Sequence, residues 1–252
     1  MTAEVVGSGL LLVLVGLAAG FVNTLAGGGS LLTLPALMLV GLPADVANGT
    51  NRLAILAQSS AGVSAFHRAG KLPTAAIGPM LLPTSAGTLI GALVASQVPA
   101  DVLETVLLGT LTAMAVVLAV APRAATAAPD ETPHTLRERP LGALGLFVAG
   151  LYGGFIQAGV GFVLLWVLGG LLRFDLVRGN ALKSVCTVVF GSLSLAVFVA
   201  AGQVAWVPAV ALAVGNTAGA LLSVRFAIEA PGAIRWVVLA AVLVAVAAAW
   251  LR

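Results

Sequence analysis

Long stretches of this chain contain no charged residue, and short polar segments separate them. The uncharged stretches cover 5–44, 72–100, 105–122, 140–172, 184–224 and 236–251. A helix needs about 20 apolar residues to cross a bilayer, so this pattern indicates membrane spans. The stretches 5–44, 140–172 and 184–224 exceed one span, and each must turn inside the membrane.

Glycine and proline residues within these stretches indicate where the chain turns. We expect helices at 4–22, 30–40, 45–66, 74–96, 101–121, 140–157, 161–172, 175–200, 205–224 and 233–251. The helices at 30–40 and 161–172 are too short to cross alone, so each should pair with the preceding helix as a broken or hairpin element. The pattern predicts an all-α polytopic membrane protein with about 8–10 membrane segments.

The composition excludes several other classes of protein. Hydrophobic residues make up 60% of the chain and charged residues 8%, whereas a soluble domain carries about 25% charged residues. So few polar groups cannot cover a water-facing globule, which excludes a soluble enzyme, a nucleic-acid binder and a disordered chain. The single cysteine, Cys186, excludes an internal disulfide and a cysteine-based metal cluster.

The chain repeats itself across a hydrophilic segment near its midpoint. Matching residues, in the same order in both halves, are Gly20 and Gly154, Asp45 and Asp175, Gly70 and Gly202, and Gly87 and Gly219. We therefore divide the chain into a first transmembrane repeat at 1–121, a cytoplasmic linker at 122–139 and a second transmembrane repeat at 140–252. Asp45 and Asp175 each precede a predicted helix and are expected to act as N-caps.

The loop charges indicate that the two halves have opposite orientations. The loop 67–73 carries Arg68 and Lys71, whereas its counterpart at 200–204 carries no charge. Lysine and arginine favour the cytoplasmic side, so corresponding loops lie on opposite sides of the membrane. This arrangement places both termini outside in a multi-pass protein of the cell (plasma) membrane. Inverted-topology repeats are typical of secondary transporters, whose substrate site lies at the repeat interface near the membrane centre.

Two basic residues lie within predicted helices. Arg52 and Lys183 each lie roughly 12 Å along the helix axis from the predicted start of their helix, at a rise of 1.5 Å per residue. A base held inside a span costs about 2.5–3.5 kcal/mol on insertion scales. One interpretation is that both side chains snorkel to the surface from tilted helices. We favour the other, in which they are a pair of cations that face an anion pathway.

Glycine clusters interrupt the chain at equivalent places in the two halves. The segments 23–30 and 157–161 are expected to be non-helical or sharply kinked and to face each other near the membrane centre. The helix that follows each break presents free N–H groups and the positive end of its dipole, which suits an anion. The alternative is that the glycines serve helix–helix packing through small residues.

The candidate substrate site combines these breaks, the two cations and the hydrogen-bonding residues beside them. Its members are Asn23, Gly27, Gly28, Gly29, Ser30, Thr50, Asn51, Arg52, Gln157, Gly159, Gly161, Asn180 and Lys183. For Thr50, Asn51 and Asn180, helix capping and packing are equally good explanations. Acidic residues are absent from the depth of the spans, and both histidines lie in loops, so we expect no catalytic residues, no metal site and no cofactor.

Two stretches carry a resemblance to a known family. The sequence GGGSLLTLPAL at 27–37, followed by ANGTN at 47–51, resembles the sulfite exporter TauE/SafE family. The resemblance covers nearly the whole chain, although the second half departs at Gly159-Val160-Gly161 and at 179–181. It implies a secondary transporter that exports sulfite, sulfonates or related organosulfur anions.

Other functions make different demands on the sequence. An intramembrane enzyme acting on a phosphorylated lipid would need acidic residues in the membrane, and an intramembrane serine protease would need a serine–histidine pair at depth. A non-transporting membrane assembly partner is the remaining alternative. We expect a transporter rather than an enzyme, with a small anion and the lipid bilayer as partners, possible homo-oligomerisation and no nucleic acid.

Overall fold

The computed structural model describes residues 3–120 and 132–229, and the regular structure within these ranges is helical. The helices in chain order are α1 (Ala3–Ala26), α2 (Ser30–Leu39), α3 (Ala44–Arg68), α4 (Thr74–Ala95), α5 (Ala100–Val120), α6 (Pro140–Phe155), α7 (Val160–Leu165), the π-helix η1 (Trp166–Leu171), α8 (Leu176–Ala200) and α9 (Trp206–Glu229). The all-α fold is confirmed. The expected helix at 233–251 and much of the expected linker at 122–139 lie outside the described residues.

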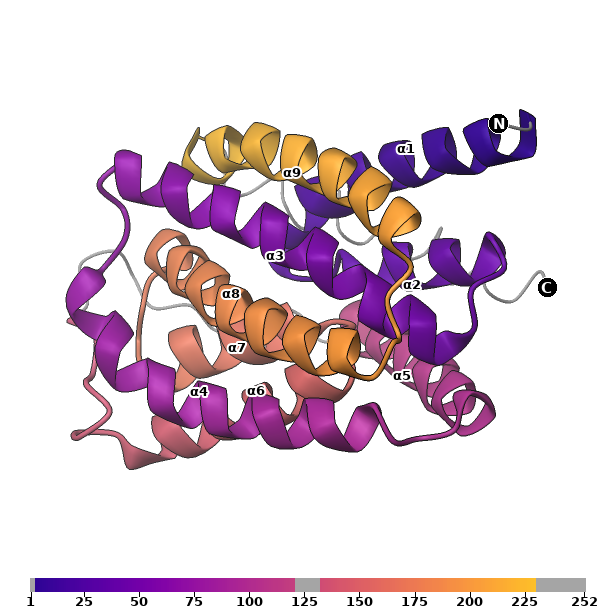
Figure 1. Ribbon diagram of the computed structural model, residues 1–252. Coiled ribbons are helices and arrows are strands. Elements are labelled where there is room, and N and C mark those ends of the chain that lie inside the picture. The colour runs from indigo at the N-terminus through magenta and orange to yellow at the C-terminus, as the bar shows by residue number, and fades with distance from the viewer. Residues whose placement is uncertain (1–2, 121–131, 230–252) are drawn as a thin grey trace.

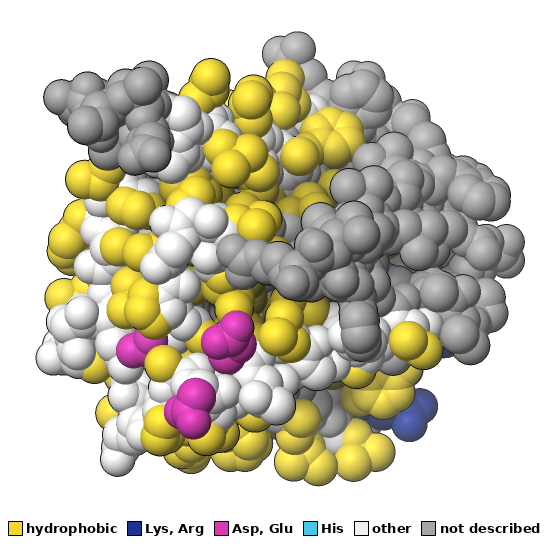
Figure 2. All heavy atoms as spheres, turned by 90° about the vertical axis from the view of Figure 1, so that its right-hand side faces the viewer, with side chains coloured by type: hydrophobic (Ala, Val, Ile, Leu, Met, Phe, Trp, Pro, Cys, Tyr) yellow, Lys and Arg dark blue, Asp and Glu magenta, His cyan; other side chains and the backbone are white. Residues whose placement is uncertain are grey.

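Several helices have the length and composition of membrane spans. Four of those described qualify on both counts: Gly7–Thr24, Thr74–Ala95, Leu176–Ala200 and Trp206–Val224. Large apolar side chains such as Leu82 and Val207 are more than three-quarters exposed. Figure 2 shows hydrophobic side chains across much of the described part of one face. An apolar surface of this extent is unfavourable in water but suited to lipid, so the chain is a membrane protein.

The helices pack in a reciprocal pattern around a central pair. The central helices α3 and α8 contact each other, and α3 also packs on α9 while α8 packs on α4 (Figure 1). Outside them, α1 packs along α9 and α4 packs along α6. Each half of the chain therefore supplies helices that are covered by the other half.

Glycines allow the two outer helix pairs to approach closely. Gly215 and Gly219 of α9 lie against the α1 backbone, and Gly87 and Gly91 of α4 lie against the α6 backbone. A Cβ atom at any of these four positions would overlap backbone atoms of the facing helix. Small residues at such contacts let helices pack tightly in a bilayer, where the hydrophobic effect does not drive them together.

The same substitution should have opposite effects at two helical glycines. Gly219→Ala is expected to lower the free energy of unfolding by about 1–3 kcal/mol, because the new methyl group must displace the α1 backbone. Gly109→Ala in α5 meets nothing within 4 Å and should stabilise the helix by about 0.5–1 kcal/mol. Thermal unfolding of both variants in detergent tests this, and a stable Gly219→Ala protein would contradict the packing described here.

The two ends of the helix bundle differ in charge. At one end, Gln203 Nε2 donates hydrogen bonds to Asp45 Oδ2 at 3.2 Å and to the Ser96 carbonyl at 3.3 Å, which joins the α8–α9 loop to the start of α3 and the end of α4. Acidic side chains gather on this face (Figure 2), where α5 begins with Asp101 in its first turn. At the other end, the His134 N–H donates to the Leu172 carbonyl at 2.8 Å.

Basic residues gather at that second end. They are Arg68, Lys71, Arg137, Arg139, Arg173 and Arg178. Asp175 caps α8 there, accepting from the Val177 and Arg178 N–H groups at 2.9 and 3.0 Å, as expected. The expected N-cap role of Asp45 is wrong, because α3 begins at Ala44 and Pro43 precedes it, so Asp45 lies in the first turn.

Candidate functional site

Two helix breaks form the centre of the site. The first separates α1 from α2 at 27–29, and the second separates α6 from α7 at 156–159. Gly27 and Gly159 have φ angles of 89° and 74°, a region that glycine enters without the steric cost of a Cβ atom. Glycine at these two positions thus allows each helix to end and the chain to reverse.

The first break is shorter than the sequence suggests. The expectation that 23–26 and Ser30 are non-helical is wrong, because α1 continues through Ala26 and α2 begins at Ser30. The expectation is also wrong for 160–161 in the second segment, which belong to α7. Thr24 Oγ1 donates to the Gly20 carbonyl at 3.0 Å within the helix, and Asn23 Oδ1 accepts from the Gly29 N–H at 3.2 Å. The side chain of Asn23 therefore ties the break to the helix without unwinding it.

The segment after the second break also differs from expectation. The expected helix at 161–172 starts at Val160 and widens into a π-helix from Trp166 to Leu171. Gly169 and Gly170 lie within the widened turn. Widened turns of this kind often occur at functional sites.

The two breaks contact each other. A Cβ atom on Gly27 would overlap the backbone of Gly161, and one on Gly161 would overlap the backbone of Gly27. Gly28 packs beside the ring of Phe162. The expected contact between the segments 23–30 and 157–161 is confirmed, because Gly161 in the first turn of α7 meets Gly27 of the first break.

Arg52 is bound to the C-terminal end of α6. Its guanidinium donates to the carbonyls of Gly153, Gly154 at 3.0 Å and Phe155 at 3.2 Å, and also to Asn48 Oδ1 at 2.9 Å. The side chain is completely buried, and Asn48 Nδ2 donates to the same Phe155 carbonyl at 2.9 Å. These contacts hold the charge inside the protein and exclude snorkelling of Arg52.

Lys183 makes the corresponding contacts at the end of α1. Its ammonium group donates to the carbonyls of Asn23 at 2.9 Å and Thr24 at 3.0 Å, and to Asn180 Oδ1 at 2.7 Å. The residue is 3% exposed, so it does not snorkel either. Each cation therefore binds the helix end of the opposite half of the chain.

The two helix ends offset only part of the charge of the two cations. The C-terminus of a helix carries a partial charge of about −0.5, so the ends of α1 and α6 together contribute about −1. Arg52 and Lys183 contribute two positive charges, and the buried side chains of the described residues include no aspartate or glutamate. The centre therefore keeps a net positive charge, to which the start of α2 adds the positive end of a helix dipole, and this charge favours a bound anion.

Hydroxyl and amide groups surround the start of α2. Asn51 Oδ1 accepts from Thr33 Oγ1 at 2.7 Å, and Asn51 Nδ2 donates to Ser30 Oγ at 3.2 Å. Because Ser30 Oγ acts as an acceptor here, its own hydrogen remains free for another acceptor. The start of α2 thus presents a buried O–H donor beside the first break.

Other candidate residues fall into two groups. Gln157 lies in the second break with its whole amide group buried and without a hydrogen-bond partner among the described residues. The structure does not bring Thr50 to this centre, because its hydroxyl accepts from the Ala205 N–H at 2.9 Å at the start of α9. A Cβ atom on Gly159 would overlap the side chain of Met114 in α5, so this glycine serves packing as well as the turn.

The sequence prediction missed Asn48 and Thr33, which complete the hydrogen bonding around Arg52 and Asn51. Asn48 precedes Arg52 by one helical turn, and that spacing places both side chains on one face. Thr33 lies one turn after Ser30 on α2 for the same reason. The helical spacing to Arg52 and Ser30 could have identified both.

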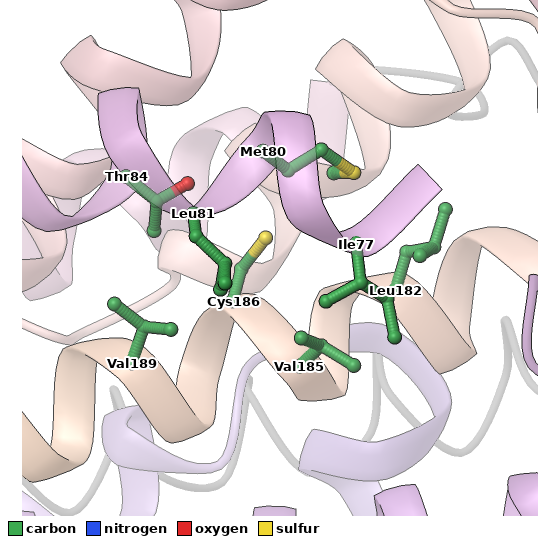
Figure 3. A pocket seen from close by; sticks show the side chains of 8 residues that line it. All are labelled: Ile77, Met80, Leu81, Thr84, Leu182, Val185, Cys186 and Val189. Atoms are coloured by element: carbon green, nitrogen blue, oxygen red, sulfur yellow. The ribbon is translucent and has the colours of Figure 1, made fainter. Parts of the chain in front are cut away.

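A small cavity between α4 and α8 is unsuited to a substrate. Its volume is about 10 Å³, and its lining is shown in Figure 3: Ile77, Met80, Leu81, Thr84, Leu182, Val185, Cys186 and Val189. A space of this size holds about one water molecule. Cys186 is 2% exposed, in keeping with a packing role.

The chain matches the family described as sulfite exporter TauE/SafE over residues 12–249. It belongs to this family. A Sinorhizobium protein named "Probable membrane transporter protein ORF9" is 29% identical over 83% of this chain and 79% of its own length. A Haemophilus influenzae protein named "Probable membrane transporter protein" is 27% identical, with 87% and 86% covered. The Escherichia coli K12 protein "Probable membrane transporter protein YfcA" is 26% identical, with 85% and 79% covered.

Membership in the TauE/SafE family and the names of these relatives support a membrane transporter, which is not an enzyme. In this TauE/SafE protein, the stretches 27–37 and 47–51 contain the first break, the start of α2 and the polar start of α3. Asn51 in the second stretch is hydrogen-bonded to Ser30 and Thr33 in the first. The two stretches therefore form one structural unit.

Proposed function

We propose that this protein is a secondary transporter that exports small anions, namely sulfite, sulfonates or related organosulfur anions, across the cell membrane. The observation that carries the proposal is the pair of buried cations, Arg52 and Lys183, beside two helix breaks. Their described hydrogen-bond partners are carbonyl and amide oxygens, which leave part of their charge for an anion. An oxyanion needs such compensation because an unpaired charge is very costly in a low dielectric.

The substrate would bind where the two breaks meet. Ser30 and Gln157 supply hydrogen-bond donors there, and the start of α2 adds the positive end of a helix dipole. The oxygens of a tetrahedral sulfonate group or of a pyramidal sulfite ion accept several hydrogen bonds at once. Donors that converge from both halves of the chain suit such an ion.

Alternating access follows if the two halves are inverted repeats. The reciprocal packing of α1 on α9 and of α4 on α6 supports that relation, as does the contact of two breaks that enter from different ends. The basic end with Arg68 and Lys71 would face the cytoplasm, which leaves both termini outside. Rocking of one half against the other would open the central site to each side in turn.

Anion-dependent stabilisation tests the proposal directly. Purified protein in detergent is heated with sulfite, thiosulfate, methanesulfonate or phosphate, each compared with chloride at equal ionic strength. An anion present at 100 times its Kd should stabilise the folded state by about 2.7 kcal/mol. Export is then measured in vesicles loaded with the best stabiliser. Equal unfolding temperatures in all anions, together with no flux, would overturn the proposal.

A further inference from the structure

The face of α8 that contacts α3 is defined by three contacts. Phe198 lies with its ring centre 5.1 Å from Arg52 Cζ, a Cβ atom on Gly191 would touch Leu56, and a Cβ atom on Gly62 would contact Ser184 Oγ. Residues 184, 191 and 198 recur every seven positions, so they lie on one stripe of the helix.

Two polar residues occupy the positions between those contacts. Thr187 and Ser194 fall on the same stripe of α8, and Ser59 falls between Leu56 and Gly62 on the facing stripe of α3. Thr187 and Ser194 are buried, as is Ser59. The α3–α8 interface is therefore lined by hydroxyl groups and glycines along its length.

Some polar atoms of this interface have no partner in the described structure. Ser194 Oγ is fully buried and makes no hydrogen bond, and the same holds for Arg52 Nε. By contrast, Thr187 Oγ1 donates to the Lys183 carbonyl at 2.7 Å. A buried hydroxyl without a partner lowers stability, so its presence at Ser194 requires an explanation other than packing.

The α3–α8 interface also extends along the helices from the position of Arg52 to the position of Lys183. Arg52 lies beside Phe198 near one end of the stripe, and Lys183 is adjacent to Ser184 near the other. We propose that the α3–α8 interface is the path of the anion between Arg52 and Lys183, with the Ser194 hydroxyl as a hydrogen-bond donor to the ion in transit. This inference rests on the proposed function and identifies the path that the ion would follow.

Removal of the Ser194 hydroxyl separates a transport role from a structural one. Ser194→Ala should unfold at the same or a higher temperature than the wild type, because it removes an unpartnered buried group. Its anion flux should fall about tenfold, since a hydrogen bond to a charged partner is stronger than a neutral one. Ser223→Ala is the matched control: Ser223 is equally buried in α9, and its hydroxyl donates to the Ala220 carbonyl at 2.8 Å. It should leave flux unchanged.

Substituted cysteines test access to the interface. In a Cys186→Ala background, Ser59→Cys and Ser194→Cys should react with a small water-soluble thiol reagent, and the stabilising anion should slow the reaction. Ser60→Cys and Ser192→Cys are controls, because these exposed neighbours face away from the interface. Because they face lipid rather than water, the water-soluble reagent should not label them, with or without the anion.

The outcomes distinguish failure of the path from failure of the function. If the wild type binds and transports an anion, but Ser194→Ala retains full flux and no anion protects the two interface cysteines, the path is wrong and the proposed function stands. If no anion stabilises the wild type and none is transported by it, both the proposed path and the proposed function are wrong. Unchanged stability with reduced flux in Ser194→Ala, together with anion protection, supports the path.

Discussion

Arg52→Gln is expected to abolish anion-dependent stabilisation and to lower the stability of the anion-free protein as well. The guanidinium satisfies three carbonyls at the end of α6, of which only that of Phe155 has another described donor, Asn48. Each buried carbonyl left without a donor costs about 1–3 kcal/mol. Because the neutral glutamine is cheaper to bury than a cation, the net loss should be about 2–4 kcal/mol.

Two further variants separate the charge of Arg52 from its geometry and test the second cation. Arg52→Lys keeps the charge but lacks the planar fork, so it should retain weak anion binding and recover part of the stability. Lys183→Gln removes the equivalent charge at the end of α1 and should weaken anion binding in the same direction. Calorimetric titration with the stabilising anion and thermal unfolding give both readouts. Wild-type affinity in Arg52→Gln and in Lys183→Gln would remove the cation pair from the mechanism.

Gly161→Ala should impair both folding and transport through the contact between the two breaks. The added methyl group would overlap the backbone of Gly27, so the two segments could not close against each other. Overpacking of this kind costs about 1–3 kcal/mol. If the closed contact is a step of the transport cycle, flux should fall about tenfold for each 1.4 kcal/mol by which that state is disfavoured.

Two glycine controls keep this result interpretable. Gly78→Ala lies in α4 with nothing within 4 Å of the added atom, so, like Gly109→Ala, it should be slightly more stable than the wild type and should keep wild-type flux. Gly41 has a φ angle of 92° but open space around it, so Gly41→Ala measures the cost of a positive φ angle without a steric overlap. The same backbone cost would apply to Gly27→Ala. Vesicle flux and thermal unfolding are measured for all variants. Wild-type flux in Gly161→Ala would show that transport does not require the two breaks to close against each other.

The helix breaks and the depth of the cations could be predicted from the sequence, because both are local features. A glycine cluster inside an overlong apolar stretch has few other structural explanations, and a charge within a span is conspicuous. The partners of the cations could not be predicted. Arg52 and Lys183 bind carbonyl oxygens, which every residue possesses, so no residue type marks them.

The register between the halves shows a second limit. Residue identity pairs Gly20 with Gly154, whereas the packing of Gly219 on Leu17 and of Gly87 on Phe147 shifts α1 against α6 by one helical turn. In that register, Asn23 and Thr24 correspond to Gly153 and Gly154, and these carbonyls bind the two cations. The residues that correspond are not identical, because the shared function lies in the backbone.

The crossed attachment of the two cations has a consequence for biosynthesis. The chain is made from its N-terminus, so α1 enters the bilayer before Lys183 has been made. The Gly27 N–H already donates to the Asn23 carbonyl, but the ammonium group that binds the Asn23 and Thr24 carbonyls comes from the other half. Unsatisfied backbone groups are costly in lipid, and the first hairpin must wait in a marginal state until α8 arrives. The end of α1 therefore gains its full set of hydrogen bonds only after the second half has been synthesised.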